Sequence, residues 1–283
     1  MIYDVNGNAL TNAYDVNGTD LDIAYDVEGT VVFRKQEEPL TLRVMTYNVG
    51  GWYTGTGDNV PAAKDADYYA LQNGIISSQD ADILCLEEYW TTFSKAGRSA
   101  VDMLAQYYPY RQLYQGDTQY WGHGVCSKYP IESYTRHYYT SETKRYYDTA
   151  VVNVNGTLLN VTVTHLGLTA EIRVQQSAEL FDYVQTLNNV ILCGDFNVNA
   201  KNETYFTDNY QQFVNAGYHL ANGGTHGLFD TYNSTDGTTW GAIDQIITSS
   251  NISIDSVWTD TTKVTDSLAD AIDHIPLIAE VTI

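Results

Sequence analysis

The sequence has few basic residues, few cysteines and no long apolar run, and each shortage argues against a class of protein. Among 283 residues, 14 are Lys or Arg and 35 are Asp or Glu, which gives a formal net charge of −21. A surface of that sign repels polyanions at long range, so it argues against a protein that grips nucleic acid through a broad basic face. It leaves phosphate chemistry open, because a bound cation reverses the local field.

The three cysteines, Cys85, Cys126 and Cys193, lie in apolar, strand-like runs without disulfide-framework or zinc spacing. We expect them to be buried free thiols. No apolar run approaches the roughly 18 residues that span a bilayer, and Met1–Leu10 has neither a basic nor an apolar segment. We therefore expect no membrane span and no cleavable signal peptide. The compartment stays open between the cytoplasm and non-classical export with attachment to a surface.

The beginning of the chain repeats every 11 residues. Tyr-Asp-Val-Asn-Gly at Tyr3–Gly7 recurs at Tyr14–Gly18 and, with Glu for Asn, at Tyr25–Gly29. Asn-Gly between short alternating stretches predicts a hairpin turn, so each copy is expected to form strand, turn and strand. Residues 1–36 would then be an attachment or oligomerisation module that binds a partner or self-associates, a small β appendage, or a flexible tail. Arg34–Pro39 has the composition of a linker.

Residues 40–283 alternate between strand and helix patterns. Helices are expected at Ala62–Ser77, from an N-cap at Ser94 to Tyr108, at Thr169–Leu187 and at Glu203–Asn215. Strands are expected at Leu42–Asn48, Asp82–Glu87, Val125–Ser127, Tyr134–Thr140, Asp148–Val154, Leu158–Thr164, Val190–Cys193, Ala242–Thr248, Ser253–Trp258 and Leu277–Ile283. Many strands, few helices and an antiparallel hairpin at Asn155-Gly156 predict two packed mixed β-sheets flanked by helices, an α/β sandwich.

Polar residues stand at six places at or beside the ends of the predicted buried strands, where a rigid sheet can position them. They are Asn48; Glu87 and Glu88; His165; Asp195 and Asn197; Asp244; and Asp273 with His274. Carboxylates suit a hard cation, amides can position oxygen atoms, and imidazoles transfer protons near neutral pH. This inventory is what metal-assisted phosphoester hydrolysis requires. Asp244 interrupts an apolar strand and therefore needs a partner.

Seven segments, over about residues 40–283, resemble the endonuclease/exonuclease/phosphatase superfamily with its DNase I-like fold. They are LRVMTYNVGG, DILCLEEYW, GVCSKYPI, VTHLG, VILCGDFNVNA, AIDQIITS and IDHIPLIAEV. They occur in the family's order and on the expected strands. The resemblance implies a four-layer α/β sandwich with two mixed sheets and a phosphoester hydrolase that uses Mg²⁺, with Mn²⁺ or Ca²⁺ as alternatives.

The resemblance also implies a metal site. Glu88 aligns with the family's metal-binding glutamate, because Glu87 stands where the family usually has Gln. Asn48 resembles the residue that orients the metal or the phosphate. Asp273 resembles a further metal-side or phosphate-side carboxylate. Ile272 departs from the pattern, because it replaces the serine of the last motif.

Catalytic roles follow for five residues. Asp195 and Asn197 resemble the pair that holds the attacking water and the scissile phosphate. His274 resembles the general acid or base, and Asp244 resembles the carboxylate that orients it. His165 resembles the second histidine, which stabilises charge on the phosphate. The additional glutamate that pairs with this second histidine in the nuclease branch has no clear match.

Two other features keep alternative interpretations. Arg145 has a guanidinium that matches phosphate geometry, so it either contacts substrate or forms a structural pair. The 24 tyrosines, with clusters at Tyr107-Tyr108, Tyr138-Tyr139 and Tyr146-Tyr147, either stack on bases or sugars or fill half-buried strand and interface positions.

The sequence thus predicts a metal-dependent phosphodiesterase or nuclease. The alternative within the superfamily is a lipid or inositol-phosphate hydrolase of the sphingomyelinase type. The alternative of another class is a surface- or particle-attached binding protein that carries the hydrolase fold as a passenger.

Overall fold

The computed structural model describes residues 13–14, 20–21, 23–25, 31–34, 39–50, 62–89, 94–95, 98–114, 122–141, 144–233, 240–260 and 274–283. The chain divides into two compact units, Met1–Leu40 and Thr41–Ile283. Among the described residues, no helix combines the length and the apolar character that crossing a membrane requires.

The described residues of the first unit form two short antiparallel strand pairs. Strand β1 (Ala13–Tyr14) pairs with β2 (Asp20–Leu21), and β3 (Ile23–Tyr25) pairs with β4 (Val31–Arg34), both antiparallel. In the second and third sequence repeats the tyrosine is therefore the last residue of the first strand of a hairpin. The first repeat, at Tyr3–Gly7, lies outside the described residues.

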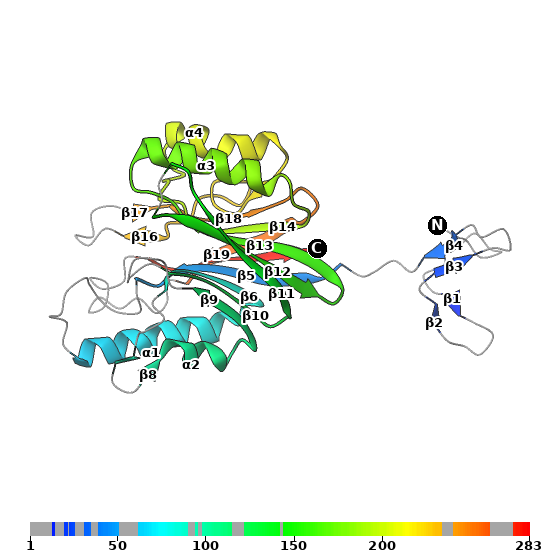
Figure 1. Cartoon of the computed structure of the whole chain (residues 1–283), viewed down its shortest axis with the longest axis horizontal. Coiled ribbons are helices and arrows are strands. Elements are labelled where there is room, and N and C mark those ends of the chain that lie inside the picture. Colours follow the sequence, from blue (N-terminus) through cyan, green and yellow to red (C-terminus); the bar gives the residue numbers. More distant parts are fainter. Residues whose placement is uncertain are drawn as a thin grey trace. The chain divides into compact units, whose positions relative to one another are not determined.

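Two six-stranded mixed sheets form the centre of the second unit (Figure 1). The order of the first sheet is β19 (Ser253–Thr259), β20 (Leu277–Thr282), β5 (Thr41–Asn48), β6 (Ile83–Tyr89), β10 (Gly122–Ser127) and β9 (Tyr110–Tyr114). The order of the second is β11 (Ile131–Tyr138), β12 (Tyr146–Val154), β13 (Thr157–His165), β14 (Val190–Asp195), β18 (Asp244–Thr248) and β15 (His219–Leu220). Two short ladders lie outside these sheets: β7 (Ser94–Lys95) with β8 (Arg98–Ser99), and β16 (Tyr232–Asn233) with β17 (Trp240–Gly241).

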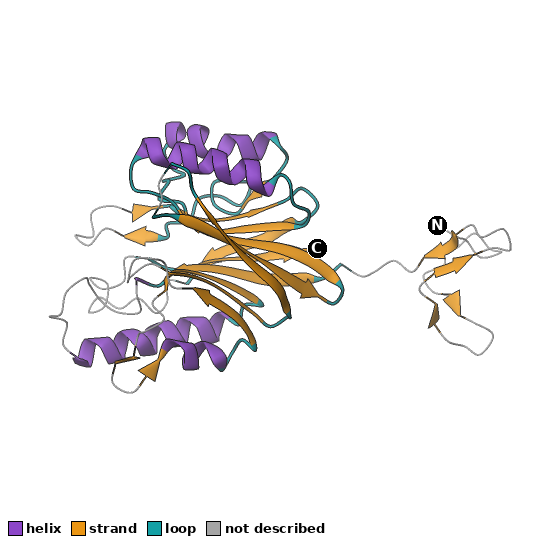
Figure 2. Ribbon diagram, in the orientation of Figure 1, coloured by secondary structure: helices purple, strands orange, loops and turns teal. Residues whose placement is uncertain are grey.

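Helices cover the outer face of each sheet (Figure 2). Helices α1 (Ala62–Gln79) and α2 (Ala100–Ala105) pack on the first sheet through one buried apolar cluster. Helices α3 (Ala170–Val184) and α4 (Glu203–Asn215) pack on the second sheet through another. The predicted four-layer α/β sandwich is confirmed, and the three cysteines are buried free thiols as expected.

Side-chain caps and a buried stripe explain why α3 and α4 form where the sequence predicts them. Thr169 accepts a hydrogen bond from the backbone N–H of Ile172, and Asn202 accepts one from the N–H of Tyr205. Helix α3 then buries Leu180 and Val184 against the sheet.

One predicted helix begins later than expected. Ser94 was expected to cap a helix that runs to Tyr108, but Ser94–Lys95 pairs with Arg98–Ser99 as two short strands. Helix α2 therefore spans only Ala100–Ala105. The run contains Gly97, which costs about 1 kcal/mol in a helix interior relative to Ala. Strand β9, at Tyr110–Tyr114, was not expected from the sequence.

Two parallel strand pairs bring the polar strand ends to one edge of the sandwich. Strands β5 and β6 are parallel, with Asn48 beside Glu87, and β13 and β14 are parallel, with His165 beside Asp195. Strand β18 is antiparallel to β14 and begins with Asp244 opposite Asp195. Because β5 packs on β14 and β6 on β13, the ends of both sheets meet at this edge.

Gly194 allows the close approach of β14 to β13 immediately before Asp195. Its φ is 150°, and a Cβ there would overlap the carbonyl oxygen of Thr164 on the neighbouring strand. Gly194→Ala is therefore expected to lower the free energy of unfolding by about 3 kcal/mol or more. Gly156→Ala, at φ 98° with open space around it, is the matched control and should cost about 1 kcal/mol. Urea denaturation of both variants measures the difference, and equal losses would contradict the steric explanation.

Candidate active site

Asp195 is the centre of a group of polar side chains at this edge. Its Oδ2 accepts a hydrogen bond from Asn48 Nδ2 at 3.1 Å, and it lies 3.4 Å from His165 Nε2 and 3.5 Å from His274 Nε2. Its Oδ1 accepts the backbone N–H of Asn197 at 2.8 Å. One buried carboxylate thus faces side-chain nitrogen atoms from the ends of β5 and β13 and from the segment that precedes β20.

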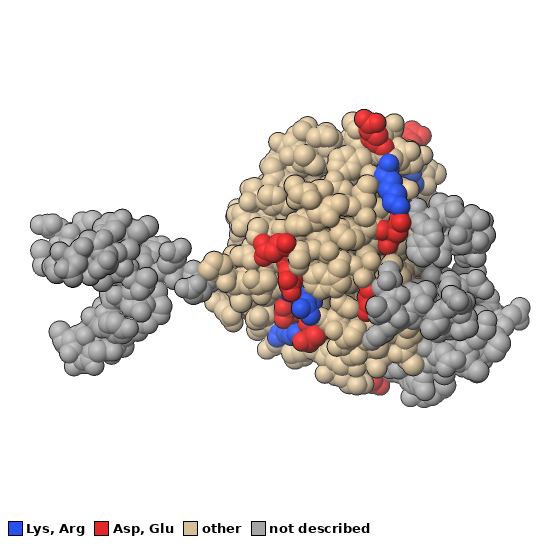
Figure 3. Space-filling view, turned by 180° about the vertical axis from the view of Figure 1, so that it is seen from behind, with Lys and Arg blue, Asp and Glu red and all other residues tan. Residues whose placement is uncertain are grey.

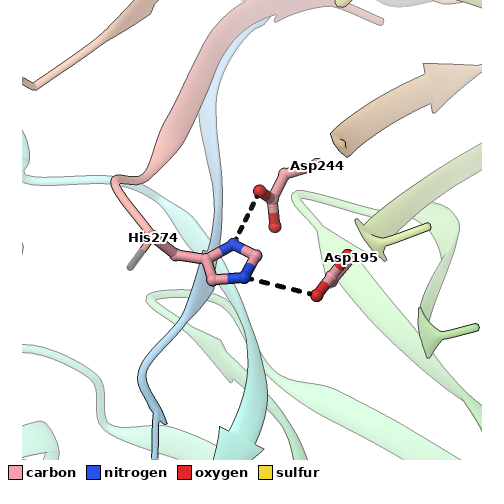
Figure 4. Close-up of side chains that lie close together, drawn as sticks. All are labelled: Asp195, Asp244 and His274. Atoms are coloured by element: carbon pink, nitrogen blue, oxygen red, sulfur yellow. Dashed lines mark hydrogen bonds and ion pairs between the residues drawn. The ribbon is translucent and has the colours of Figure 1, made fainter. Parts of the chain in front are cut away.

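His274 and Asp244 form a buried dyad. Nδ1 of His274 lies 2.9 Å from Oδ2 of Asp244, and its Nε2 points to Asp195 (Figure 4). Asp244 was expected to need a partner, and the structure supplies this imidazole. Because Asp244 holds Nδ1, Nε2 is the ring nitrogen that faces the other polar groups of the site.

Asn48 links Asp195 to Glu88. Its Nδ2 donates to Glu88 Oε1 and to Asp195 Oδ2, both at 3.1 Å, while its Oδ1 accepts the backbone N–H of Gly50. Glu88 is half-buried and has a φ of 53°, a left-handed backbone conformation at the strand end. This arrangement holds two carboxylate oxygens on one amide nitrogen, so they lie close together.

His165 and Asn197 complete the group. His165 Nε2 lies 4.0 Å from Glu88 Oε1 and closer to Asp195. Burial lowers the pKa of His165 well below its ordinary value, and the nearby Arg145 adds to this, so the ring is neutral near pH 7. Asn197 donates its side-chain N–H to the carbonyl oxygen of Leu166, which ties the loop after β13 to the loop after β14.

Several acidic side chains are buried close together at this edge. Burial raises the pKa of Asp195 to about 6. Burial, followed by the charge of Asp244, raises the pKa of Glu87 well above its ordinary value. Oε2 of Glu87 and Oδ1 of Asp244 are buried without a hydrogen-bond partner. A buried carboxylate oxygen without a hydrogen-bond partner is stabilised by binding a proton or a cation.

The sequence comparison decides the family. Residues 45–267 match the Endonuclease/Exonuclease/phosphatase family. The chain belongs to this family. Membership makes it a phosphoester hydrolase of the endonuclease/exonuclease/phosphatase type. No curated protein sequence matches the chain.

Solved structures show the same fold. An endonuclease/exonuclease/phosphatase family protein from Bacteroides thetaiotaomicron has 15% identity and a TM-score of 0.65, over 87% of this chain and 99% of that one. TDP2 from D. rerio, complexed with a single-strand DNA product, has 15% identity and a TM-score of 0.64, over 85% and 98%. ANGEL2, a 2',3'-cyclic phosphatase complexed with adenosine-2',3'-vanadate, has 14% identity and a TM-score of 0.65, over 87% and 96%.

The donor atoms fit the divalent cation that the family implies. Oxygens of Glu88 and Asp195 share one amide nitrogen of Asn48. Asp195, Asp244 and His274 also place one possible ligand atom each within 4.8 Å of one another. However, Nδ1 of His274 is already hydrogen-bonded to Asp244, which suits a proton-transfer dyad better than a ligand set. The oxygen-rich side of the site, at Glu88 and Asp195, suits a hard cation.

Most of the residues predicted from the sequence come together. Asn48, Glu88, His165, Asp195, Asp244 and His274 form a single connected group, with Asn197 attached through Asp195. Arg145 lies beside it, and its Nη1 donates to the carbonyl oxygen of His165 at 3.3 Å. Asp273 lies outside the described residues.

Sequence reasoning missed two residues that hold the dyad in place. Thr231 Oγ1 accepts the backbone N–H of Asp244, and its carbonyl oxygen accepts the N–H of Ile275. The ring of Tyr232 packs against the imidazole of His274, with ring centroids 5.3 Å apart. Thr231 directly precedes the two-residue strand β16 and Tyr232 begins it, and a strand this short has no motif or hydrophobic period that could mark them in the sequence.

Proposed function

We propose that the chain is a divalent-metal-dependent phosphodiesterase that acts on nucleic acid. The observation that carries this proposal is the placement of the His274–Asp244 dyad against Asp195, Asn48 and Glu88. The proposal is supported by the proximity of this imidazole to carboxylate oxygens that can bind a cation, at the edge where both sheets present their strand ends.

His274 is the proposed proton carrier. Asp244 fixes Nδ1 and stabilises the imidazolium when Nε2 takes up a proton. Asp195 faces Nε2 and accepts hydrogen bonds through both oxygens, so it can orient an attacking water toward phosphorus. Asn197 is the proposed partner of Asp195 in holding the phosphate, and neutral His165 can donate a hydrogen bond to a phosphate oxygen.

Glu88, with Asn48 holding its carboxylate, is the proposed cation site, and Asp273 is a further proposed ligand. A bound Mg²⁺, or Mn²⁺ or Ca²⁺ in its place, neutralises charge on the phosphate and polarises the P–O bond. Arg145 lies against the backbone of His165, close enough to the group to contact a substrate phosphate as the sequence suggested.

Nucleic acid is the favoured substrate class, and two neighbours of the same fold support it: TDP2 was crystallised with a single-strand DNA product and ANGEL2 with an adenosine derivative. The described residues on the face drawn in Figure 3 form no broad basic patch, so we expect weak capture of long duplexes. A lipid or inositol-phosphate hydrolase remains the second candidate within the family.

A substrate panel with Mg²⁺ tests the proposal. Short DNA and RNA oligonucleotides should be hydrolysed at least about tenfold faster, as kcat/KM, than p-nitrophenyl phosphate, sphingomyelin or inositol phosphates. Fastest turnover of sphingomyelin or an inositol phosphate would favour the second candidate. Absence of hydrolysis across the panel would contradict the enzyme proposal and favour a binding protein.

A further inference from the structure

Beside the catalytic group, on the side toward β9 and β11, lies a second cluster that the mechanism does not use. It joins aromatic rings to one arginine and one buried carboxylate, and we call it the tyrosine–arginine cluster. Its members are Tyr114, Tyr134, Arg136, Tyr138, Tyr146 and Asp148. They come from the edge strands β9 and β11 of the two sheets and from β12, next to β11.

The pairing registers of the strands place this cluster at the catalytic end of the sandwich. Tyr114 pairs with His123 on β10, whose neighbour Gly122 pairs with Tyr89, the residue after Glu88. Tyr146 follows Arg145, whose guanidinium binds the carbonyl oxygen of His165. The cluster therefore lies at the same end of the two sheets as the site. It is further toward the sheet edge than Glu88 in one sheet and than His165 in the other.

The charge of Arg136 is already matched inside the cluster. Its Nε and Nη2 contact the two carboxylate oxygens of Asp148 at 2.8 and 3.0 Å, and Asp148 is fully buried. The hydroxyl of Tyr134 donates to the same carboxylate at 2.9 Å. A guanidinium paired in this way has little charge left for a phosphate, so this is no phosphate clamp.

Arg136 instead orders aromatic rings. Its guanidinium carbon lies 3.8 Å from the ring centroid of Tyr146 and 5.0 Å from that of Tyr114. Tyr114 is also stacked on Tyr134, with centroids 5.1 Å apart and planes 16° apart. Tyr138 meets Tyr146 edge to face. The rings are held by neighbours on two strands of one sheet and one strand of the other.

Two of these rings reach solvent. Tyr114 is 49% exposed and Tyr138 is 48% exposed, whereas Tyr146 is 3% exposed. The adjacent tyrosine pairs of the sequence therefore have two different roles. Four of their members are buried, as a structural role requires: Tyr108, Tyr139, Tyr146 and Tyr147. Tyr138 is the member of those pairs that presents half of its side chain outward, and like Tyr114 it lies at the catalytic end of its strand.

We propose that Tyr114 and Tyr138, the two exposed rings of the tyrosine–arginine cluster, provide a platform on which nucleobases next to the scissile phosphate stack, and that single-stranded nucleic acid is the substrate. This inference rests on the proposed function. A chain with 14 basic and 35 acidic residues has few basic side chains to bind phosphates along a strand, whereas base faces stack on tyrosine irrespective of charge. Bases in a duplex are already stacked and do not reach such a platform.

The test compares two oligonucleotides of equal length, one of thymidylates and one with abasic residues at the same phosphates. The ratio of their kcat/KM values measures recognition of the base. Base stacking on one aromatic side chain corresponds to roughly a tenfold effect, so the wild type should prefer the thymidylate strand by about tenfold or more. Tyr138→Ala should lose most of this preference, and Tyr138→Phe, which keeps the ring, should retain it.

Tyr110 provides the matched control. It is 40% exposed on the same strand as Tyr114 but pairs with Ser127, at the far end of β9, so Tyr110→Ala should leave the ratio unchanged. The inference is overturned if the wild type hydrolyses both oligonucleotides equally well, or if Tyr110→Ala and Tyr138→Ala change the ratio alike. In both cases the proposed phosphodiesterase function still stands.

A binding measurement distinguishes failure of the stacking platform from failure of the proposed phosphodiesterase function. In EDTA, the fluorescence of a 2-aminopurine in a single-stranded oligonucleotide should fall on binding to the wild type, because stacking quenches it, and should fall less with Tyr138→Ala. If neither oligonucleotide is hydrolysed but this quenching occurs, the proposed function is contradicted and the platform is supported. Equal quenching by both proteins contradicts the platform.

Discussion

Replacing His274 with alanine is expected to lower kcat on a phosphodiester by about a thousandfold, with little change in KM. The physical reason is that Nε2, the ring nitrogen facing Asp195 at 3.5 Å, is the proposed proton carrier. Stopped or steady-state assays with bis(p-nitrophenyl) phosphate and Mg²⁺ measure the loss. His219→Ala, on the exposed end of β15, is the control and should stay within about twofold of the wild type.

Asp244 should act through His274, and a double-mutant cycle tests this. Asp244→Asn removes the charge that fixes Nδ1 at 2.9 Å, so we expect kcat to fall by about a hundredfold or more. The double variant should be no slower than His274→Ala alone, because the carboxylate has no further role once the imidazole is gone. Additive losses would contradict the dyad.

Glu88→Gln is also expected to have a large effect, on metal binding. It removes one negative charge while it keeps the shape of the side chain, so the affinity for Mg²⁺ should fall by about a hundredfold. Isothermal titration calorimetry measures that affinity directly, without substrate. Glu132→Gln, an exposed glutamate on β11, is the charge-matched control and should leave the affinity unchanged.

The same variant makes a prediction about activity. If Glu88 acts by holding the cation, Glu88→Gln should recover part of its lost rate as the Mg²⁺ concentration rises, because mass action refills a weakened site. An unchanged Mg²⁺ affinity would show that the cation is held elsewhere, for which the group of Asp195, Asp244 and His274 is then the candidate.

The edge that carries the candidate active site could be predicted because it follows from strand order. Asn48, His165 and Asp195 end buried strands in the sequence, and parallel neighbours deliver their carboxyl ends to one edge. Asp244 could be predicted to need a partner, since a carboxylate in an apolar strand is costly alone. Local pattern and motif were sufficient for these residues.

Other features depend on packing between segments that are far apart in the sequence. Thr231 and Tyr232 support the dyad from the start of the two-residue strand β16, which is too short to show a pattern in the sequence. Tyr114 meets Arg136 only because β9 of one sheet packs beside β11 of the other. The late start of α2 has a local origin instead, because Ser94–Lys95 pairs with the nearby Arg98–Ser99 in place of a helical turn.

The most direct test of the central claim is the rate at which the wild-type chain hydrolyses a phosphodiester before and after Mg²⁺ is restored to protein treated with EDTA. We predict background hydrolysis of bis(p-nitrophenyl) phosphate in EDTA and steady turnover once Mg²⁺ is in excess. Equal rates in the two conditions would contradict the account.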